Sequence, residues 1–476
     1  MRHLYIYTRF SIVTVLLFVT SCSVSKRMKS PYTEVPPPEQ YCRSDEAGVA
    51  IESYWWEEFG SDELDAVVEH SLYENYTLKQ SWWKIVEACA QYKIIGADLK
   101  PHVFSNFSID RSKQPLLFGT PIPALLPDLP EDFHLTAYSH SFFLSYELDI
   151  WNRIRSEQQA ACLEMLATRE DLESTALLLS GTVVDAWLSL MEQHQQYALI
   201  QEQIEVSQKL LKLVEVRYGM GVAQAIDVTQ QRLQLESVIE NTFPIQSNIE
   251  VIENQLNVLL GGVPCDCRFH FPEEGIELPP FPDIGSPFDL LVNRPDLRAF
   301  QKRISAADYG VAAAIAARFP ALSLMMDYTN FAQEIADLFK RSAWEIALNT
   351  LTPLFDGGKR RAEVLRRRAI LCGLITAYTQ AFLNALEEVE SSLAEEKYQK
   401  ALVEQIQKEL DISARNLVQA RRSYLNGLND YLTVITAIQV KQNLERRLIN
   451  EKINLLKIRS KLYRALGGVN WTTCNS

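Results

Sequence analysis

The sequence lacks the residue patterns on which most enzymes and nucleic-acid-binding proteins depend. Its seven histidines are scattered, without the H-E-x-x-H spacing of zinc proteases, and no G-x-S-x-G nucleophile elbow occurs. Asp and Glu number 60 against 47 Lys and Arg, so the net charge of -13 leaves no basic excess to neutralise phosphates. These absences argue against an enzyme and a nucleic-acid partner, and we expect no cofactor.

Cysteine pairs and long apolar runs are also scarce. The eight cysteines lack the pair-and-pair spacing of zinc sites, and Cys265 and Cys267 form the only close pair. That pair could bind a metal, but a redox-sensitive or chance pair is the better interpretation, so we expect no metal site. No continuous run of 18 or more apolar residues follows the amino-terminal segment. A mature chain that enters a membrane would therefore do so by strands.

The amino terminus has the features of a secretory signal. A basic start at Arg2 precedes the apolar run 10–19, which is too short to span a bilayer as a helix. The run ends in Val-Thr-Ser-Cys, which resembles a lipobox, so we expect residues 1–21 to be removed and Cys22 to be lipidated, for example by palmitate. An ordinary cleavage site with an incidental cysteine is the alternative. Residues 22–50 are predicted to be the lipid anchor and a polar, proline-rich linker.

An internal repeat is the strongest organisational signal. Residues 217–228 match residues 423–434, an offset of 206 positions. Leu260-Gly261-Gly262 recurs at the same offset as Leu466-Gly467-Gly468. The chain therefore carries two copies of one plan, and the helices between these landmarks have equal length.

Each copy contains a long helical hairpin. The first is predicted over 153–260, interrupted by Pro244, and the second over 359–466, which contains no proline in its helices. Helices of this length exceed ordinary globular ones and indicate coiled-coil-like packing. Leu448, Leu455 and Leu462 recur every seven residues, a stripe that we interpret as a buried helix face.

Four segments alternate between apolar and polar residues with a period of two. They predict strands at about 102–111, 136–149, 320–330 and 342–354. One face is rich in aromatic residues, which is typical of a lipid-facing strand, and the other is polar. The polar residues that we expect to face a wet lumen are Asp110, Glu147, Asp327, Glu345 and Asn349. A soluble half-buried hairpin gives the same alternation, and the carboxylates could instead mark strand ends.

Four strands are too few for a closed membrane barrel, which needs at least about eight. Open strand edges cannot lie in hydrocarbon, because their backbone groups would lack hydrogen bonds. If these strands span a membrane, the barrel must be shared between chains. Three copies would supply twelve strands and twelve long helices.

These pieces, in this order and spacing, resemble the TolC/OprM-type outer-membrane factors, in the branch of NodT-type lipoproteins of RND efflux systems. The resemblance covers nearly the whole mature chain and is carried by motifs in both halves: Tyr146 to Trp151, Arg294-Pro295-Asp296-Leu297, Pro353 to Gly358, Tyr424 to Val434 and Tyr463 to Gly468. It implies a mainly helical fold with a membrane β-barrel portion, a TolC-like trimeric channel-tunnel. The expected plan is a first repeat over 51–262, a connector over 263–286, a second repeat over 287–468 and a tail over 469–476.

The resemblance implies a passive exit duct for small molecules such as drugs or metals. Its partners would be two further copies of the chain, a periplasmic adaptor and an inner-membrane pump of the RND type, in the outer membrane. The adaptor would contact the tips where the long helices reverse: Tyr218, Gly219, Gly221, Ala223, Tyr424, Gly427, Asn429 and Asp430. The alternatives are a channel for type I protein secretion and a structural coiled-coil lipoprotein without a channel.

The sequence departs from the family at the aperture, where an acidic ring is not clearly placed. Arg415, Arg421 and Arg422 precede the second tip, with Asp411 the nearest preceding carboxylate, and Asp227 follows the first tip. We therefore hypothesise that gating depends on one of these arginines pairing with an acid of another helix.

Overall fold

A computed structural model describes residues 31–42, 54–115, 132–264, 269, 271 and 275–468. The predicted signal peptide, Cys22, the pair Cys265 and Cys267, and the tail 469–476 lie outside the described residues. The chain divides into two compact units. The sheet unit comprises Met1–Tyr32, Val86–Ala167 and Gln301–Thr376, and the hairpin unit comprises Thr33–Ile85, Thr168–Phe300 and Ala377–Ser476.

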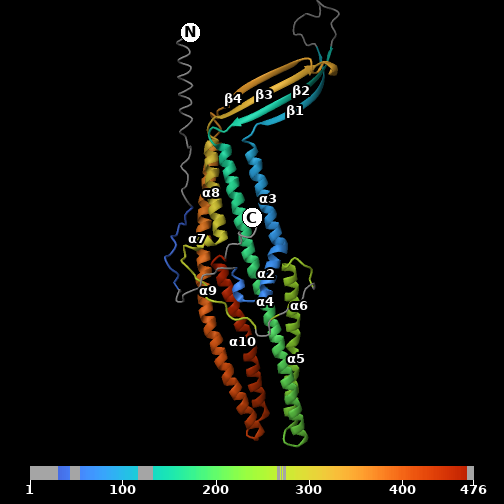
Figure 1. Cartoon of the computed structure of the whole chain (residues 1–476), viewed down its shortest axis with the longest axis vertical. Coiled ribbons are helices and arrows are strands. Elements are labelled where there is room, and N and C mark those ends of the chain that lie inside the picture. Colours follow the sequence, from blue (N-terminus) through green and yellow to red (C-terminus); the bar gives the residue numbers. More distant parts are fainter. Residues whose placement is uncertain are drawn as a thin grey trace, which may run out of the picture. The chain divides into compact units, whose positions relative to one another are not determined.

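The sheet unit contains one antiparallel four-stranded sheet in the order β1-β2-β3-β4 (Figure 1). The strands are β1 (His102–Pro115), β2 (Asp132–Leu148), β3 (Ala321–Ala332) and β4 (Ser342–Leu351). All four predicted strands are confirmed, and β1 and β2 are longer than predicted. β4 ends at Leu351, three residues early, and Pro353, which has no N–H to donate, lies just beyond that end.

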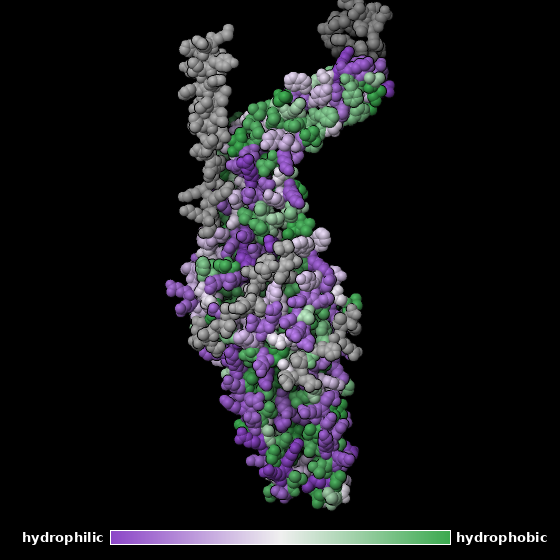
Figure 2. Space-filling view, viewed as in Figure 1, coloured by the Kyte–Doolittle hydropathy of each residue, from purple (hydrophilic) through white to green (hydrophobic). Residues whose placement is uncertain are grey.

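The register of the strands separates an apolar face from a polar face. Phe142 lies opposite Tyr328, which lies opposite Trp344. The same face carries mainly apolar and aromatic side chains from all four strands: Val103, Phe107, Ile109, Tyr138, Leu144, Tyr146, Leu322, Leu324, Met326, Ile346 and Leu348. Figure 2 shows hydrophobic residues gathered over the strands. Trp344 is 70% exposed, so this face is not covered within the described part of the chain.

Each hairpin starts with a helix that directly follows a strand. α4 (Arg153–Gly219) follows β2 and α9 (Lys359–Leu425) follows β4, and each has 67 residues. Asp149 accepts hydrogen bonds from the backbone N–H groups of Ile154 and Arg155 at the start of α4. Asp356 does the same for Gly358 and Arg360 at the start of α9. The two copies of the plan thus use the same carboxylate cap.

Both long helices are apolar enough in part to raise the question of a helical membrane span. α4 and α9 each contain an 18-residue stretch that could cross a membrane by length and composition alone. In α4, 56% of that stretch is buried inside the chain, against 28% in α9. Because the core of a soluble helical bundle has the same composition, we retain the strands as the candidate membrane-spanning elements.

The remaining helices follow the predicted plan with two breaks. They are α2 (Asp62–Glu74), α3 (Tyr76–Ala97), α5 (Ala225–Glu240), α6 (Thr242–Leu259), α7 (Leu290–Asn293), α8 (Pro295–Ala316) and α10 (Tyr431–Ala465). The predicted interruption at Pro244 is confirmed, since α5 ends before Asn241 and Pro244 lies in the first turn of α6. α2 and α3 are separated at Asn75, whose side chain accepts hydrogen bonds from the N–H groups that start α3.

The repeat is also visible in how the hairpins end. The carbonyl oxygens of Leu259 and Ala465, which are related by the offset of 206, each accept a hydrogen bond from a residue at a helix junction. Asn75 Nδ2 donates to the first at 2.8 Å, and Arg294 Nη1 donates to the second at 3.2 Å. Gly467, with a left-handed φ of +104°, packs so tightly that a Cβ would lie 2.9 Å from the backbone of Asn293. Close packing of a helix end against a helix junction therefore explains the Leu-Gly-Gly motif.

Candidate functional site

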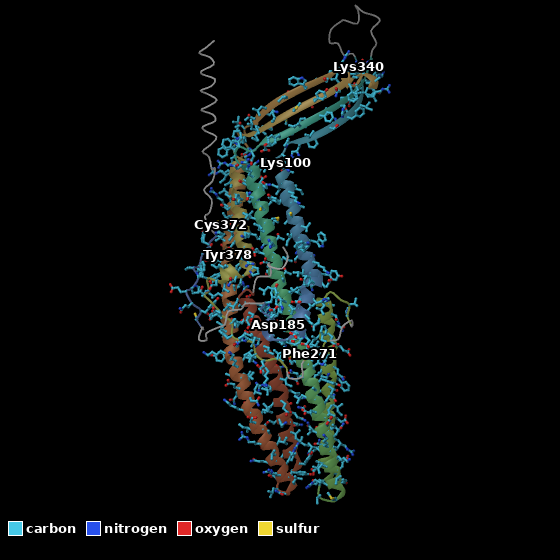
Figure 3. The ribbon with its side chains drawn as sticks, in the orientation of Figure 1. Lys100, Asp185, Phe271, Lys340, Cys372 and Tyr378 are labelled. Carbon is cyan, nitrogen blue, oxygen red and sulfur yellow. The ribbon has the colours of Figure 1, made fainter. Side chains whose placement is uncertain are left out.

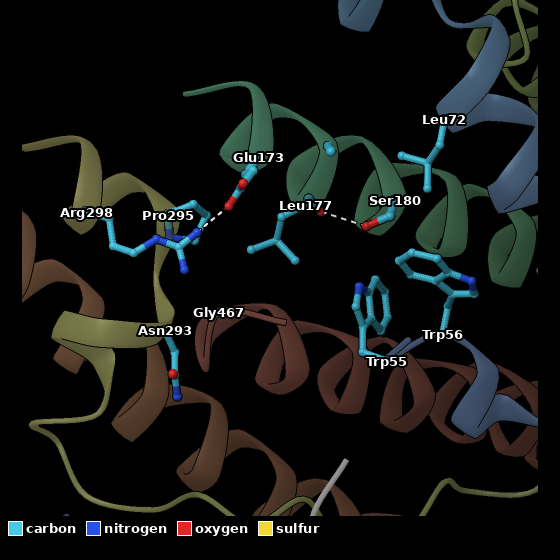
Figure 4. Close-up of a pocket in the computed structure, with 11 residues that line it drawn as sticks. Trp55, Trp56, Leu72, Glu173, Leu177, Ser180, Asn293, Pro295, Arg298 and Gly467 are labelled. Carbon is cyan, nitrogen blue, oxygen red and sulfur yellow. Dashed lines mark hydrogen bonds and ion pairs between the residues drawn. The ribbon is translucent and has the colours of Figure 1, made fainter. Parts of the chain in front are cut away.

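In the sheet unit, a cleft of about 650 Å³ that is open to solvent is lined by helix residues such as Ala306, Gly310 and Arg367. In the hairpin unit, a cavity of about 30 Å³ lies beside Trp55 and Trp56 (Figure 4). This volume holds about one water molecule, whereas ligand clefts are typically about 300–1,000 Å³. No group of three or more His, Cys, Asp or Glu side chains with metal-binding geometry occurs within the described ranges. The residues that the sequence singled out lie instead on the faces, edges and ends of the elements.

The polar face of the sheet brings together the residues that we predicted to face a lumen. Asp327 on β3 lies directly opposite Glu345 on β4, and Thr329 Oγ1 donates a 2.6 Å hydrogen bond to Asp327. Asp110, Glu147 and Asn349 have the same parity in the strand register and so share this face. Like charges placed directly opposite each other destabilise a dry sheet, which makes a wet environment the suitable one for this face.

The two outer strands of the sheet each have a free edge. β1 pairs only with β2 and β4 only with β3 among the described residues. Each free edge carries unpaired backbone N–H and C=O groups along strands of 14 and 10 residues. Such edges are templates for pairing with another strand.

The two helix reversals lie in the hairpin unit and have the same geometry. Gly221 and Gly427 adopt left-handed φ values of +75° and +71°. At each turn, a backbone N–H bonds to the carbonyl five residues earlier, as in a Schellman motif. The predicted tip residues Ala223 and Asn429 lie in the short loops that follow these glycines. Exposed apolar side chains gather at both reversals: Tyr218, Met220, Val222, Leu425, Leu428 and Leu432.

A polar cluster joins the first hairpin to the second just inside these reversals. Tyr424 Oη donates a 3.2 Å hydrogen bond to the carboxylate of Asp227, which is 9% exposed. The guanidinium of Arg217 lies 5.1 Å from the centre of the Tyr424 ring. Burial, followed by the negative charge of Asp227, raises the pKa of Tyr424 above its ordinary value. Tyr431 Oη donates to Gln231 at 2.7 Å. The cluster thus restrains α9 and α10 against α4 and α5.

Of the predicted aperture residues, only Asp227 lies in this cluster. Arg415, Arg421 and Arg422 form no ion pair with any described residue of the same chain, and Nε of Arg421 is buried without a partner. Their pairing with an acid of another copy stays a prediction. Sequence reasoning missed Arg217 and Tyr431. Arg217 lies at the repeat position of Ser423, so the repeat gave no signal for it.

A second polar network, which sequence reasoning also missed, fixes the connector to α10. Arg459, 1% exposed, donates to both carboxylate oxygens of Glu396 on α9, at 2.9 and 2.6 Å. It also donates to the carbonyl of Pro279 and stacks on Phe281, at 5.2 Å from the ring centre. Tyr463 Oη donates to the carbonyl of Pro280 at 2.8 Å. We call this network the connector latch. A helical arginine beside a leucine stripe does not reveal its partners.

Part of the predicted linker packs against α9. The backbone N–H of Glu34 donates to Thr379 Oγ1 at 2.9 Å, and that of Cys42 donates to Glu390 at 2.6 Å. Tyr41 between them is only 5% exposed. Residues 33–42 thus form a strap on α9 within the hairpin unit, whereas composition alone suggested a free linker.

Comparison with known proteins agrees with this architecture. The profile of a family described as outer membrane efflux protein matches residues 67–262 and 287–468. The chain is 27% identical to the probable efflux pump outer membrane protein TtgC of Pseudomonas putida, over 96% of this chain and 95% of that protein. It is 25% identical to the pyoverdine export outer membrane protein OpmQ of Pseudomonas aeruginosa, over 96% of each chain.

Solved structures show the same fold. The structure of CusC superposes with a TM-score of 0.83 at 24% identity, covering 94% of this chain and all of that one. The CmeC outer membrane channel of Campylobacter jejuni superposes with a TM-score of 0.80 at 21% identity, covering 94% and 95%. The predicted TolC-like fold, four antiparallel strands with long helices, is confirmed. With the profile matching most of both halves, the chain belongs to the outer membrane efflux protein family, as the non-enzymatic outer-membrane channel of a tripartite efflux pump.

Proposed function

We propose that three copies of the chain form one closed duct, in which their sheets make a twelve-stranded barrel across the outer membrane. The observation that carries this proposal is the four-stranded sheet with an exposed apolar face and two free edges. In hydrocarbon, free edges require partners, because each unpaired backbone group costs several kcal/mol. Pairing the β1 edge of one copy with the β4 edge of the next satisfies both edges. Three copies give an even strand number above the minimum of about eight.

The proposed barrel assigns a role to each face of the sheet. The aromatic-rich face around Phe142 and Trp344 would contact lipid. The opposite face, with Asp327 and Glu345, would line a water-filled lumen and keep its carboxylates hydrated. The channel would be passive, and the inner-membrane pump would supply the energy. Small molecules such as drugs or metals would be its cargo, since similar proteins are named for antibiotic efflux, toluene efflux and pyoverdine export.

The polar cluster just inside the helix reversals would hold the duct closed at rest. Tyr424 and Asp227 join α9 to α5, so that widening the periplasmic end requires breaking this bond in each copy. The exposed apolar residues at both reversals, such as Val222 and Leu428, would bind a periplasmic adaptor protein that couples the duct to an RND-type pump. Lipidation of Cys22, which lies outside the described residues, would add a membrane anchor ahead of the strap.

In-cell photo-crosslinking from the tips tests this proposal. A crosslinking amino acid would replace Ala223 or Asn429, and captured proteins would be identified by mass spectrometry. The duct predicts capture of a periplasmic adaptor, together with its pump, from both positions. Asn450 on α10, which is exposed and lies 21 residues beyond Asn429, provides the control position. Capture of only the chain itself or of cell-wall material would favour a structural lipoprotein over a duct.

A further inference from the structure

Every junction between a strand and a helix in the sheet unit carries an exposed basic residue. Lys100 lies before β1, Arg155 in the first turn of α4 after β2, Arg318 before β3, and Lys359 and Arg361 in the first turn of α9 after β4. We call these five residues the basic junction. The strand register places all four junctions at the same end of the sheet, since His102 is near the end of β2, Leu148 pairs with Leu322, and Ala321 pairs with Leu351. Figure 3 shows Lys100 at this end and Lys340 at the opposite one.

The nearby carboxylates already have other partners. Asp149 and Asp356 cap the starts of α4 and α9. Glu147 pairs with Arg153 at 2.9 Å, and Asp98 lies 3.6 Å from His102. Across the described ranges, no residue of the basic junction has a carboxylate within ion-pair distance.

The partners of the basic junction within the chain are therefore few. Arg155 donates to the neutral amide oxygen of Asn152 at 3.3 Å, and all five side chains are exposed. The chain has a net charge of -13, so a basic composition does not explain why five cations without acid partners gather at one end of the sheet. They are available for an external anion.

Exposed apolar side chains adjoin the cations. Leu354 and Phe355, between β4 and Lys359, are each 93% exposed. Val103 and Phe319 flank the other junctions with 63% and 38% exposure. An apolar layer followed directly by a cationic layer matches the order of hydrocarbon and phosphate in a bilayer leaflet. Arg also suits phosphate, because its guanidinium can donate two parallel hydrogen bonds.

We propose that the basic junction binds the headgroup phosphates of anionic phospholipids, such as phosphatidylglycerol, in the leaflet nearest the helices. This proposal rests on the proposed function, because it requires that the strands cross a membrane. The lipids would fix the depth of the barrel in the bilayer. The favoured ligand is a phospholipid with a net negative charge, since a zwitterionic headgroup offers the five cations no net attraction.

Native mass spectrometry of the full chain in detergent tests the proposal by titration with phosphatidylglycerol or phosphatidylcholine. The junction variant replaces one cation at each junction: Lys100→Gln, Arg155→Gln, Arg318→Gln and Arg361→Gln. The matched control removes four exposed cations from the helices of the hairpin unit: Lys84→Gln, Lys212→Gln, Lys408→Gln and Lys452→Gln. We expect the junction variant to bind phosphatidylglycerol about tenfold or more weakly than the wild type, and the control to bind it as the wild type does.

Two results would overturn the proposal: equal binding of both lipids by the wild type, or equal loss of phosphatidylglycerol binding in the junction variant and the control. Conductance of the same preparations in planar bilayers of phosphatidylcholine separates this failure from that of the proposed function. A wild-type protein that conducts but does not prefer phosphatidylglycerol contradicts the lipid site alone. A protein that forms no channel in either lipid contradicts the duct.

Discussion

Replacing Arg459 by Met should open the connector latch while preserving the volume of the side chain. The variant leaves the carboxylate of Glu396, 2% exposed, without its two bonds from Arg459, and it removes the donor to the carbonyl of Pro279. Lys400, at 2.9 Å from Glu396, compensates in part. Removing one partner of a buried ion pair typically costs about 3–5 kcal/mol. At the lower bound, the open population of the connector rises about 100-fold.

Proteolysis under native conditions measures this change, because cleavage follows the population of the open form when opening is fast. A glutamate-specific protease cleaves the bond after Glu277, two residues before Pro279, and mass spectrometry quantifies that fragment. Arg447→Met on the same helix is the matched control, since Arg447 is half exposed and lies 4.0 Å from Glu451. We expect an acceleration of about 100-fold for Arg459→Met and little change for the control.

A double replacement, Arg459→Met with Glu396→Leu, should recover much of the loss, because it removes the unpaired buried charge. Equal cleavage rates in Arg459→Met and Arg447→Met would refute the latch. The pH gives a further check. Burial alone would raise the pKa of Glu396, but hydrogen bonds from Arg459 and Lys400 outweigh it and hold the pKa below its ordinary value of 4.5. The contribution of the ion pair is therefore present above that value and is lost as the pH falls below it.

Three further predictions concern other contacts. Gly181→Ala should lower the free energy of unfolding by about 1 kcal/mol, because a Cβ there overlaps the side chain of Arg464, which pairs with Asp185 at 3.0 Å. Gly373→Ala should raise it by a similar amount, because the space around Gly373 is open. Melting-temperature shifts of equal sign in the two variants would contradict this reasoning. Burial, with the charges of Glu57, Asp62 and Glu69, raises the pKa of Asp65 to about 6. Asp65→Asn should therefore raise the melting temperature at pH 8 but not at pH values below about 4. A gain in melting temperature that is independent of pH would contradict this prediction. Tyr424→Phe removes the hydrogen bond to Asp227 and should increase resting conductance. Tyr218→Phe, at the equivalent position of the first tip, should leave conductance unchanged, because that side chain is exposed. Equal conductance of the two variants would argue against a restraint at the tip.

The elements of the fold were predictable because they repeat and alternate over long stretches. The 206-residue offset located both hairpins, and Gly221 and Gly427 take the left-handed conformation that a tight reversal requires. The alternation in β2 fixed which face is apolar, since a one-residue shift in register would move Phe142 to the other face.

The polar contacts between distant elements were not predictable. Asn75 ends a helix that its apolar spacing would continue, because its side chain bonds to a carbonyl 184 residues away. In the sequence, Arg459 and Glu396 look like ordinary helical residues. Their ion pair becomes apparent only when the structure places α9, α10 and the connector together. By sequence, Tyr41 belongs to the predicted linker, and only the packing of the strap on α9 buries its side chain. Such partners depend on tertiary geometry and leave no periodic signal along the chain.

Disulfide crosslinking between the free sheet edges tests the twelve-stranded barrel most directly. In a chain whose cysteines other than Cys22 are replaced by serine, Ser108→Cys on β1 is combined in turn with Ala343→Cys, Glu345→Cys, Ala347→Cys or Asn349→Cys on β4, all on the polar face. Within one chain β1 and β4 are separated by two strands, about 14 Å in all, which a disulfide cannot span. The account predicts that at least one combination gives crosslinked dimers and trimers, with no species above three copies. The absence of crosslinks in every combination, or a ladder that continues beyond three, would contradict it.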